Sequence, residues 1–185
     1  MNGTTAPFKT ASGAMRTRAY RAAKRGELTH IARGIYLPTD APVADWDLIE
    51  VATRRPEATI CLTSALAHHD LTDDIPAQLD IAMYRGGRIP ASNGAIAWHT
   101  FDRNTFHLGR TEIPIAGTDL TIGLYSPERT IADAFRLRGQ VGYEIARDAL
   151  KEWLRRGGKP AVMAQYALTL PRAQKPLMAA LEVLA

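Results

Sequence analysis

This sequence contains a single cysteine and no long apolar run. Because Cys61 is alone, the chain can form neither an internal disulfide nor a zinc site that needs several cysteines. No apolar stretch approaches the roughly 20 residues of a membrane-spanning helix, and the Thr/Ala/Gly-rich start lacks the apolar core of a signal peptide. We therefore expect a cytoplasmic protein with no membrane partner.

The common signatures of nucleotide-binding and catalytic sites are also missing. The sequence contains no GxxxxGK[ST] loop, no GxGxxG ahead of a helix, and no kinase HRD or DFG motif. No Ser/His/Asp or Cys/His arrangement with identifiable roles emerges. Catalytic residues therefore stay unassigned, and the length of 185 residues suits one compact domain or a small module plus a body.

Acidic residues are nearly absent from the first 38 positions. This segment holds seven Lys or Arg against one acid, Glu27, for a net charge of +6. The remaining residues hold 16 cations and 18 acids, for a net charge of −2. Such a basic segment attached to a nearly neutral body is typical of a protein that binds nucleic acid through one module.

The pattern inside this segment predicts a basic helix followed by a hairpin. Tyr20, Ala23 and Leu28 recur at roughly helical spacing, and Gly26 ends the helix. Residues 28–31 and 35–37 read as two strands joined by a turn at Arg33-Gly34. Helix plus hairpin indicates a winged helix-turn-helix module, in which cations meet the phosphates of a duplex. The candidate DNA-binding residues are Arg16, Thr17, Arg18, Arg21, Lys24, Arg25, Arg33 and Tyr36.

Roles within this set follow from position. We expect base reading by Arg16, Thr17 and Arg21 near the start of the helix, and a phosphate or minor-groove contact by Arg33 at the wing tip. The alternative is a solvated basic helix packed on a hairpin without a ligand. Only residues 7–11 offer an ordered segment ahead of the helix, so the module is either abbreviated or without its first helix.

The composition divides the chain into four parts. We predict a flexible N-terminus at 1–14, the winged helix-turn-helix module at 15–38, a linker at 39–43 and an α/β domain at 44–185. The fold class is α+β, in which the small module precedes a mixed α/β body with a central β-sheet and C-terminal helices. The body is expected to begin with a helix capped by Asp45 and a short helix, 64–69, capped by Thr63. Strands at 79–84, 95–101, 112–116 and 120–125 follow, then helices after Ser126-Pro127-Glu128 and from Tyr143, 161 and 173.

Several clusters in the body invite a chemical interpretation. His68-His69-Asp70 and the acids Asp70, Asp73 and Asp74 could ligate a metal ion, but packing and solvated loop acids explain them, so no metal site is predicted. The turn Arg85, Gly86, Gly87 and Arg88 is a candidate phosphate or partner contact, against the alternative of a solvated hairpin turn. Asp133 has intrahelical arginine partners within reach.

Taken together, residues 16–158 resemble the AbiEi family of antitoxins. The resemblance rests on GELTHIARGIYLP, TSALAHHDLTDDIP, AWHTF, LYSPERTIADAFRLRG and GYEIARDALKEWLRRGG; RGIY and SPERTIADAF are its most specific parts. It implies a winged helix domain that binds the promoter of its own operon as an autorepressor. It also implies a C-terminal α/β antitoxin domain whose cognate partner is an AbiEii-like nucleotidyltransferase toxin.

Two other functions remain open beside this antitoxin and repressor. One is an atypical serine kinase that inactivates the toxin by phosphorylation, the only alternative that needs ATP and magnesium as cofactors. The other is a protein that sequesters the toxin and has lost its DNA binding.

Overall fold

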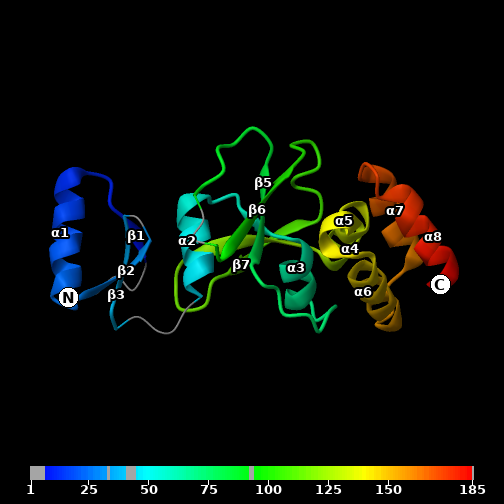
Figure 1. The fold of residues 1–185 in the computed structure, drawn as a ribbon, viewed down its shortest axis with the longest axis horizontal. Helices are drawn as coiled ribbons and strands as arrows, with labels where there is room; N and C mark the ends of the chain where they lie inside the picture. Colours follow the sequence, from blue (N-terminus) through cyan, green and yellow to red (C-terminus); the bar gives the residue numbers. More distant parts are fainter. Residues whose placement is uncertain (1–6, 33, 41–44, 92–93, 185) are drawn as a thin grey trace. The chain divides into compact units, whose positions relative to one another are not determined.

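The computed structural model describes residues 7–32, 34–40, 45–91 and 94–184 (Figure 1). The chain forms two compact units. The N-terminal unit comprises Met1–Ala58 and Glu112–Ile122, and the C-terminal unit comprises Thr59–Thr111 and Gly123–Ala185. The fold is mixed α/β, with a five-stranded sheet and a series of C-terminal helices, as the sequence predicted.

The N-terminal unit begins with a small antiparallel sheet and one long helix. Its elements are β1 Phe8–Lys9, α1 Gly13–Lys24, β2 Leu28–Ala32 and β3 Ile35–Pro38, with the strand order β1-β3-β2. Helix α1 leads directly into the hairpin β2–β3, as predicted. Strand β1 lies in the segment for which we expected a flexible terminus, because Phe8 and Lys9 pair with Tyr36 and Ile35 on β3.

The buried face of α1 differs from the face that the sequence suggested. Ala19 is buried and Ala22 and Ala23 are half-buried, at the i, i+3, i+4 spacing of one helix face. Tyr20, which we expected on this face, is 54% exposed. Small alanines let the helix lie against strand β2, while the bulky Tyr20 ring stays largely in solvent. The Ser12 hydroxyl caps the start of the helix by accepting from the Met15 N–H.

Helix α2, Trp46–Arg54, also belongs to the N-terminal unit. Asp45 caps it by accepting from the backbone N–H groups of Asp47 and Leu48, as predicted. The sequence predicts this helix as the first element of the body, whereas the structure groups it with residues before Thr59. Residues 41–43 of the predicted linker lie outside the described residues.

A five-stranded sheet follows. Its strands are β4 Thr59–Ile60, β5 Leu79–Tyr84, β6 Ile96–Phe101, β7 Arg110–Pro114 and β8 Thr121–Tyr125, in the order β6-β5-β4-β8-β7. Strand β4 pairs antiparallel with β5 and parallel with β8, and β5 pairs parallel with β6. The sequence predicted four of these strands but missed β4, whose two residues are too few to show an alternating pattern.

The C-terminal unit also contains helices. They are α3 Leu62–His68, α4 Pro127–Arg136, α5 Arg138–Val141, α6 Tyr143–Arg155, α7 Pro160–Thr169 and α8 Gln174–Leu184. Helix α4 packs on α3, α6, α7 and α8, and buries Ile131 and Phe135 among them. Its start at Ser126 was predicted correctly. Helix α3 instead begins two residues before Ser64, and Cys61 rather than Thr63 is its N-cap. No helix within the described ranges is both long and apolar enough to span a bilayer.

Candidate functional site

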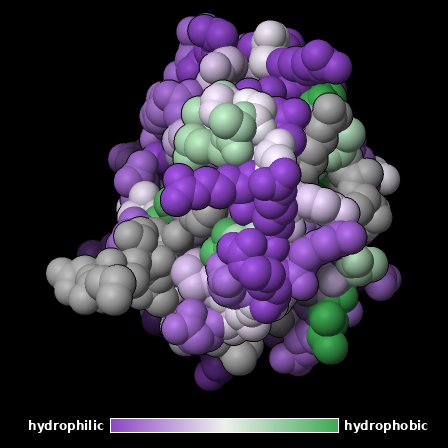
Figure 2. Space-filling view, turned by 90° about the vertical axis from the view of Figure 1, so that its left-hand side faces the viewer, coloured by the Kyte–Doolittle hydropathy of each residue, from purple (hydrophilic) through white to green (hydrophobic). Residues whose placement is uncertain are grey.

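The exposed face of α1 gathers most of the predicted DNA-binding residues. Arg16, Thr17, Arg18, Arg21 and Lys24 are all exposed, and the helix contains no acidic residue. Among the residues that the structure describes, none forms an ion pair with Arg16, Arg18 or Arg21. The side of the molecule that carries α1 is largely hydrophilic (Figure 2). These three guanidiniums are therefore available to an anionic partner.

Helical geometry divides these residues into a central row and two flanks. Successive residues turn by about 100°, so Thr17, Arg21 and Lys24 share one stripe, while Arg16 and Arg18 lie on its two sides, each roughly 100° from its centre. The Thr17 hydroxyl donates to the Gly13 carbonyl at 3.1 Å and can still accept. The Lys24 ammonium lies 5.6 Å from the centre of the Tyr20 ring. This arrangement of a polar row between cations suits a helix that lies along a groove between two phosphate strands.

Arg25 differs from the other cations because it has an acidic partner. Its Nε and Nη2 donate to the two carboxylate oxygens of Glu27 at 2.6 and 3.0 Å. This hydrogen bonding lowers the pKa of Glu27 and raises the pKa of Arg25. Both groups stay charged near neutral pH, so the pair offers little net charge to DNA.

The hairpin contributes less than the sequence suggested. Tyr36 is only 4% exposed and its ring lies 4.9 Å from the ring of His30. A buried side chain cannot lie on a duplex, so Tyr36 is a packing residue and not part of the candidate DNA-binding surface. Arg33, at the predicted wing tip, lies outside the described residues.

The two histidines at the end of α3 differ in their surroundings. A ring nitrogen of His69 lies 2.7 Å from the Tyr125 carbonyl oxygen, while His68 is exposed. Within the described part of the chain, no group of three or more His, Cys, Asp or Glu side chains could hold a metal ion. His69 therefore links the end of α3 to β8.

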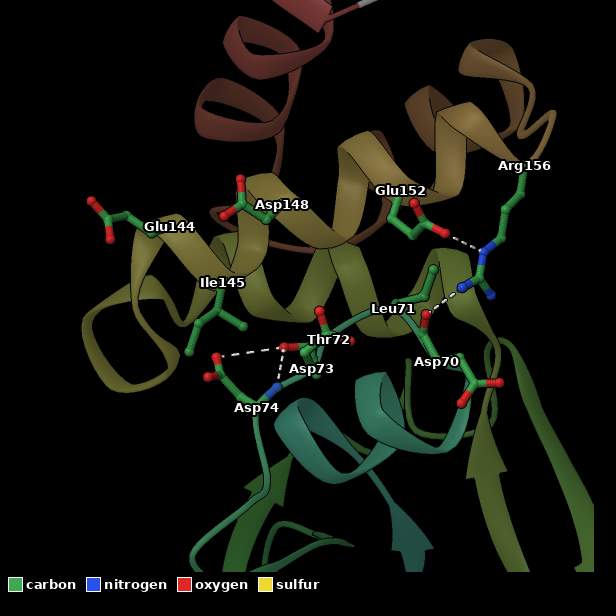
Figure 3. Close-up of a pocket in the computed structure, with 10 residues that line it drawn as sticks. All are labelled: Asp70, Leu71, Thr72, Asp73, Asp74, Glu144, Ile145, Asp148, Glu152 and Arg156. Carbon is green, nitrogen blue, oxygen red and sulfur yellow. Dashed lines mark hydrogen bonds and ion pairs between the residues drawn. The ribbon is translucent and has the colours of Figure 1, made fainter.

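The loop acids instead border an open cavity of about 590 Å³, the acidic cavity, between the loop after α3 and helix α6. Its carboxylates are spread along the walls and do not converge (Figure 3). Arg156 lies at one end, where it donates to Glu152 and to the carbonyl oxygens of His69 and Asp70. Hydrogen bonds from Arg155 and Arg156 lower the pKa of Glu152 to about 2.

The turn after β5, residues 85–88, contributes one residue to a second cavity. Arg85 lines this second cavity, of about 360 Å³, together with Arg136 and Arg172. The other three residues of the turn are not among its lining residues. No sequence pattern indicates Arg136 or Arg172 as partners of Arg85, because the three residues are far apart in the chain. Only the packing of α4 and the α7–α8 turn brings them together.

Behind this cavity lies a buried cluster of charges on α4. Arg129 and Asp133 are fully buried, and Arg129 Nε donates to Asp133 at 2.8 Å. Arg136 Nε donates to the other oxygen of the same carboxylate at 2.7 Å. Arg129 also donates to the carbonyl oxygens of Thr105 and Leu108 and stacks 4.3 Å from the centre of the Tyr125 ring. The predicted intrahelical pairing of Asp133 is confirmed.

Comparisons with solved structures include a distant match. No protein-family model matches the chain, and no curated protein does. The crystal structure of the RV2827C protein from Mycobacterium tuberculosis matches with a TM-score of 0.49 and 17% sequence identity. The match covers 91% of this chain and 69% of that chain.

Proposed function

We propose that this protein is a DNA-binding antitoxin that represses its own operon. The observation that carries the DNA-binding part is the exposed face of α1, where Arg16, Arg18 and Arg21 have no acidic partner among the described residues. A protein gains no stability from three neighbouring cations left unpaired, since like charges on one helix repel each other. A phosphate backbone supplies the missing counter-charge.

Electrostatic binding of this kind has a measurable signature. A contact between a cation and a phosphate releases condensed counterions, so log affinity falls with log salt by about 0.9 per phosphate on duplex DNA. Four exposed cations on α1, counting Lys24, give an expected slope of about −3 to −4.

The antitoxin part of the proposal rests on the AbiEi resemblance. The cognate partner would be an AbiEii-like nucleotidyltransferase toxin encoded beside this protein, and both would act in the cytoplasm. Neutralisation by direct binding is the version that we favour, because no kinase motif supports the phosphorylation alternative.

The DNA-binding part is tested with the full chain and the DNA upstream of its own gene. We expect the Arg16→Gln/Arg18→Gln/Arg21→Gln variant to lose at least about a hundredfold in affinity and most of the salt slope. The matched control is Lys151→Gln/Lys159→Gln/Lys175→Gln, which removes three exposed charges from the C-terminal unit. If the two triple variants bind DNA equally well in a mobility-shift titration, α1 is not the DNA-binding surface.

The antitoxin part is tested by mixing the protein with the product of the neighbouring gene, with and without ATP and magnesium. We expect a stable complex in both conditions and an unchanged toxin mass. A mass increase of one phosphate that requires ATP would instead favour the kinase alternative. Absence of both a complex and a mass change would contradict the antitoxin function.

A further inference from the structure

The second cavity lies at the edge of the five-stranded sheet and carries an excess of positive charge. Its charged lining consists of the guanidiniums of Arg85, Arg136 and Arg172 and one carboxylate, that of Asp102. The Asp102 carboxylate already accepts from the Asn104 N–H at 2.9 Å. We call this space the arginine cavity.

The three guanidiniums come from separate elements. Arg85 follows β5, Arg136 is the last residue of α4, and Arg172 lies between α7 and α8. Arg85 and Arg172 are exposed, and neither forms an ion pair with any residue within the described ranges. Both side chains therefore keep their full donor capacity.

Arg136 is the fixed member of this group. Its side chain is 8% exposed, its Nε is bound to Asp133, and its guanidinium carbon lies 4.8 Å from the centre of the Phe101 ring. These contacts occupy Nε and one face of the guanidinium. The described residues supply no hydrogen-bond partner for its Nη1 and Nη2. These two terminal nitrogens can therefore donate hydrogen bonds to a ligand.

The positive charge behind the cavity is not fully balanced by negative charge. Asp133 is the one carboxylate, within the described part of the chain, that pairs with Arg129 or with Arg136. Two guanidiniums thus share a single negative charge, and one of them, that of Arg129, is fully buried. Arg129 Nη2 is buried and has no hydrogen-bond partner among the described residues. An uncompensated buried charge is costly, and a nearby anion reduces that cost.

From these observations we infer that the arginine cavity binds a phosphate group. Guanidinium forks match the geometry of phosphate oxygens and bind them through paired N–H donors. The cavity of about 360 Å³ exceeds the size of one phosphate and falls within the roughly 300–1,000 Å³ of small-molecule sites. The ligand is therefore either inorganic phosphate or the phosphate end of a small organic molecule such as a nucleotide. This site is separate from α1 and does not depend on the proposed DNA binding.

The test is calorimetric titration of the full chain with sodium phosphate and, in a second arm, with ATP, at an ionic strength held constant with sodium chloride. We expect binding in at least one arm. The Arg85→Gln/Arg172→Gln variant changes two exposed side chains, and we expect it to bind at least about tenfold more weakly. Its matched control, Lys151→Gln/Lys175→Gln, removes the same charge from exposed positions outside the cavity and should bind like the parent.

A third variant separates this site from the DNA surface. Arg16→Gln/Arg18→Gln/Arg21→Gln should retain phosphate or ATP binding, because α1 does not line the cavity. ATP binding at least tenfold tighter than phosphate binding identifies a nucleotide as the ligand, and similar affinities identify the phosphate group alone. The inference is overturned if neither probe binds at millimolar concentration, if the lysine control loses as much affinity as the cavity variant, or if the α1 variant loses the binding.

Discussion

Arg129 donates to Asp133 at 2.8 Å in the interior of the C-terminal unit, where both side chains are fully buried. The same carboxylate accepts from Arg136. A single negative charge therefore holds two guanidiniums, and a neutral side chain of the same shape would leave both uncompensated.

The first prediction concerns this carboxylate. Asp133→Asn should lower the free energy of unfolding by about 3 to 5 kcal/mol, because removing one partner of a buried ion pair leaves the other charge buried and unpaired. Urea unfolding followed by far-ultraviolet circular dichroism measures the change. The matched control is Asp148→Asn, because the Asp148 carboxylate pairs with Arg147 at the surface. This change should lower the free energy of unfolding by less than about 0.5 kcal/mol. A loss below about 1 kcal/mol for Asp133→Asn would show that the cluster tolerates its excess charge.

The second prediction compares two glycines. A Cβ at Gly158 would overlap the Trp153 ring, while a Cβ at Gly139 would meet no atom within 4 Å. The Trp153 ring is held in place because its indole N–H donates to Glu128 at 3.1 Å. We expect Gly158→Ala to destabilise the protein by about 1 to 3 kcal/mol. Gly139→Ala, in helix α5, should be neutral or stabilise by up to about 1 kcal/mol. Thermal unfolding measures both, and equal melting temperatures for the two variants would contradict the packing at Trp153.

The third prediction concerns the pair Arg25 and Glu27. Glu27→Gln removes the carboxylate that occupies two donors of Arg25, so the freed guanidinium becomes available to phosphate. We expect tighter binding to both operator and unrelated duplexes, and a salt slope that is steeper by about 0.9. The control is Glu144→Gln, an exposed acid on α6 that makes the same change in net charge. A similar gain with both variants would mean that net charge, and not Arg25, sets the affinity.

Local signals in the sequence predicted much of the fold. Ser126 followed by Pro127 and Glu128 marks the start of α4, and Asp45 marks the start of α2, because capping depends on residues that are neighbours in the chain. The two-residue strands β1 and β4 could not be predicted in this way. Each is defined by its partner strand and not by a pattern of its own.

The same distinction, between features set by nearby residues and features set by tertiary contacts, applies to the candidate sites. The cations of α1 could be predicted because charge and helical period are both visible in the sequence. The burial of Tyr36 and the exposure of Tyr20 could not, since a tyrosine suits either environment. The arginine cavity could not be predicted from the sequence, because Arg85, Arg136 and Arg172 meet only through tertiary packing.

The last prediction separates base reading from phosphate contact on α1. Arg21 lies in the central row of the exposed face and Arg18 lies on a flank, by the helical period of about 100° per residue. A side chain in the central row points into the groove and reaches base edges, whereas a flanking side chain reaches the phosphate strand beside the helix. Arg16, predicted from the sequence to read bases, lies on the other flank, so we expect it to contact phosphate as Arg18 does.

The two positions therefore predict different losses. Arg21→Ala should weaken binding to the operator by about 1 to 3 kcal/mol and leave binding to a scrambled duplex nearly unchanged. Arg18→Ala should weaken both duplexes by a similar factor and reduce the salt slope by about 0.9. Once footprinting has located the operator upstream of the gene, titrations of both duplexes at several salt concentrations measure these differences. If Arg18→Ala abolishes the preference for the operator while Arg21→Ala weakens both duplexes equally, the helix enters the groove on its Arg18 side and the central row does not read bases.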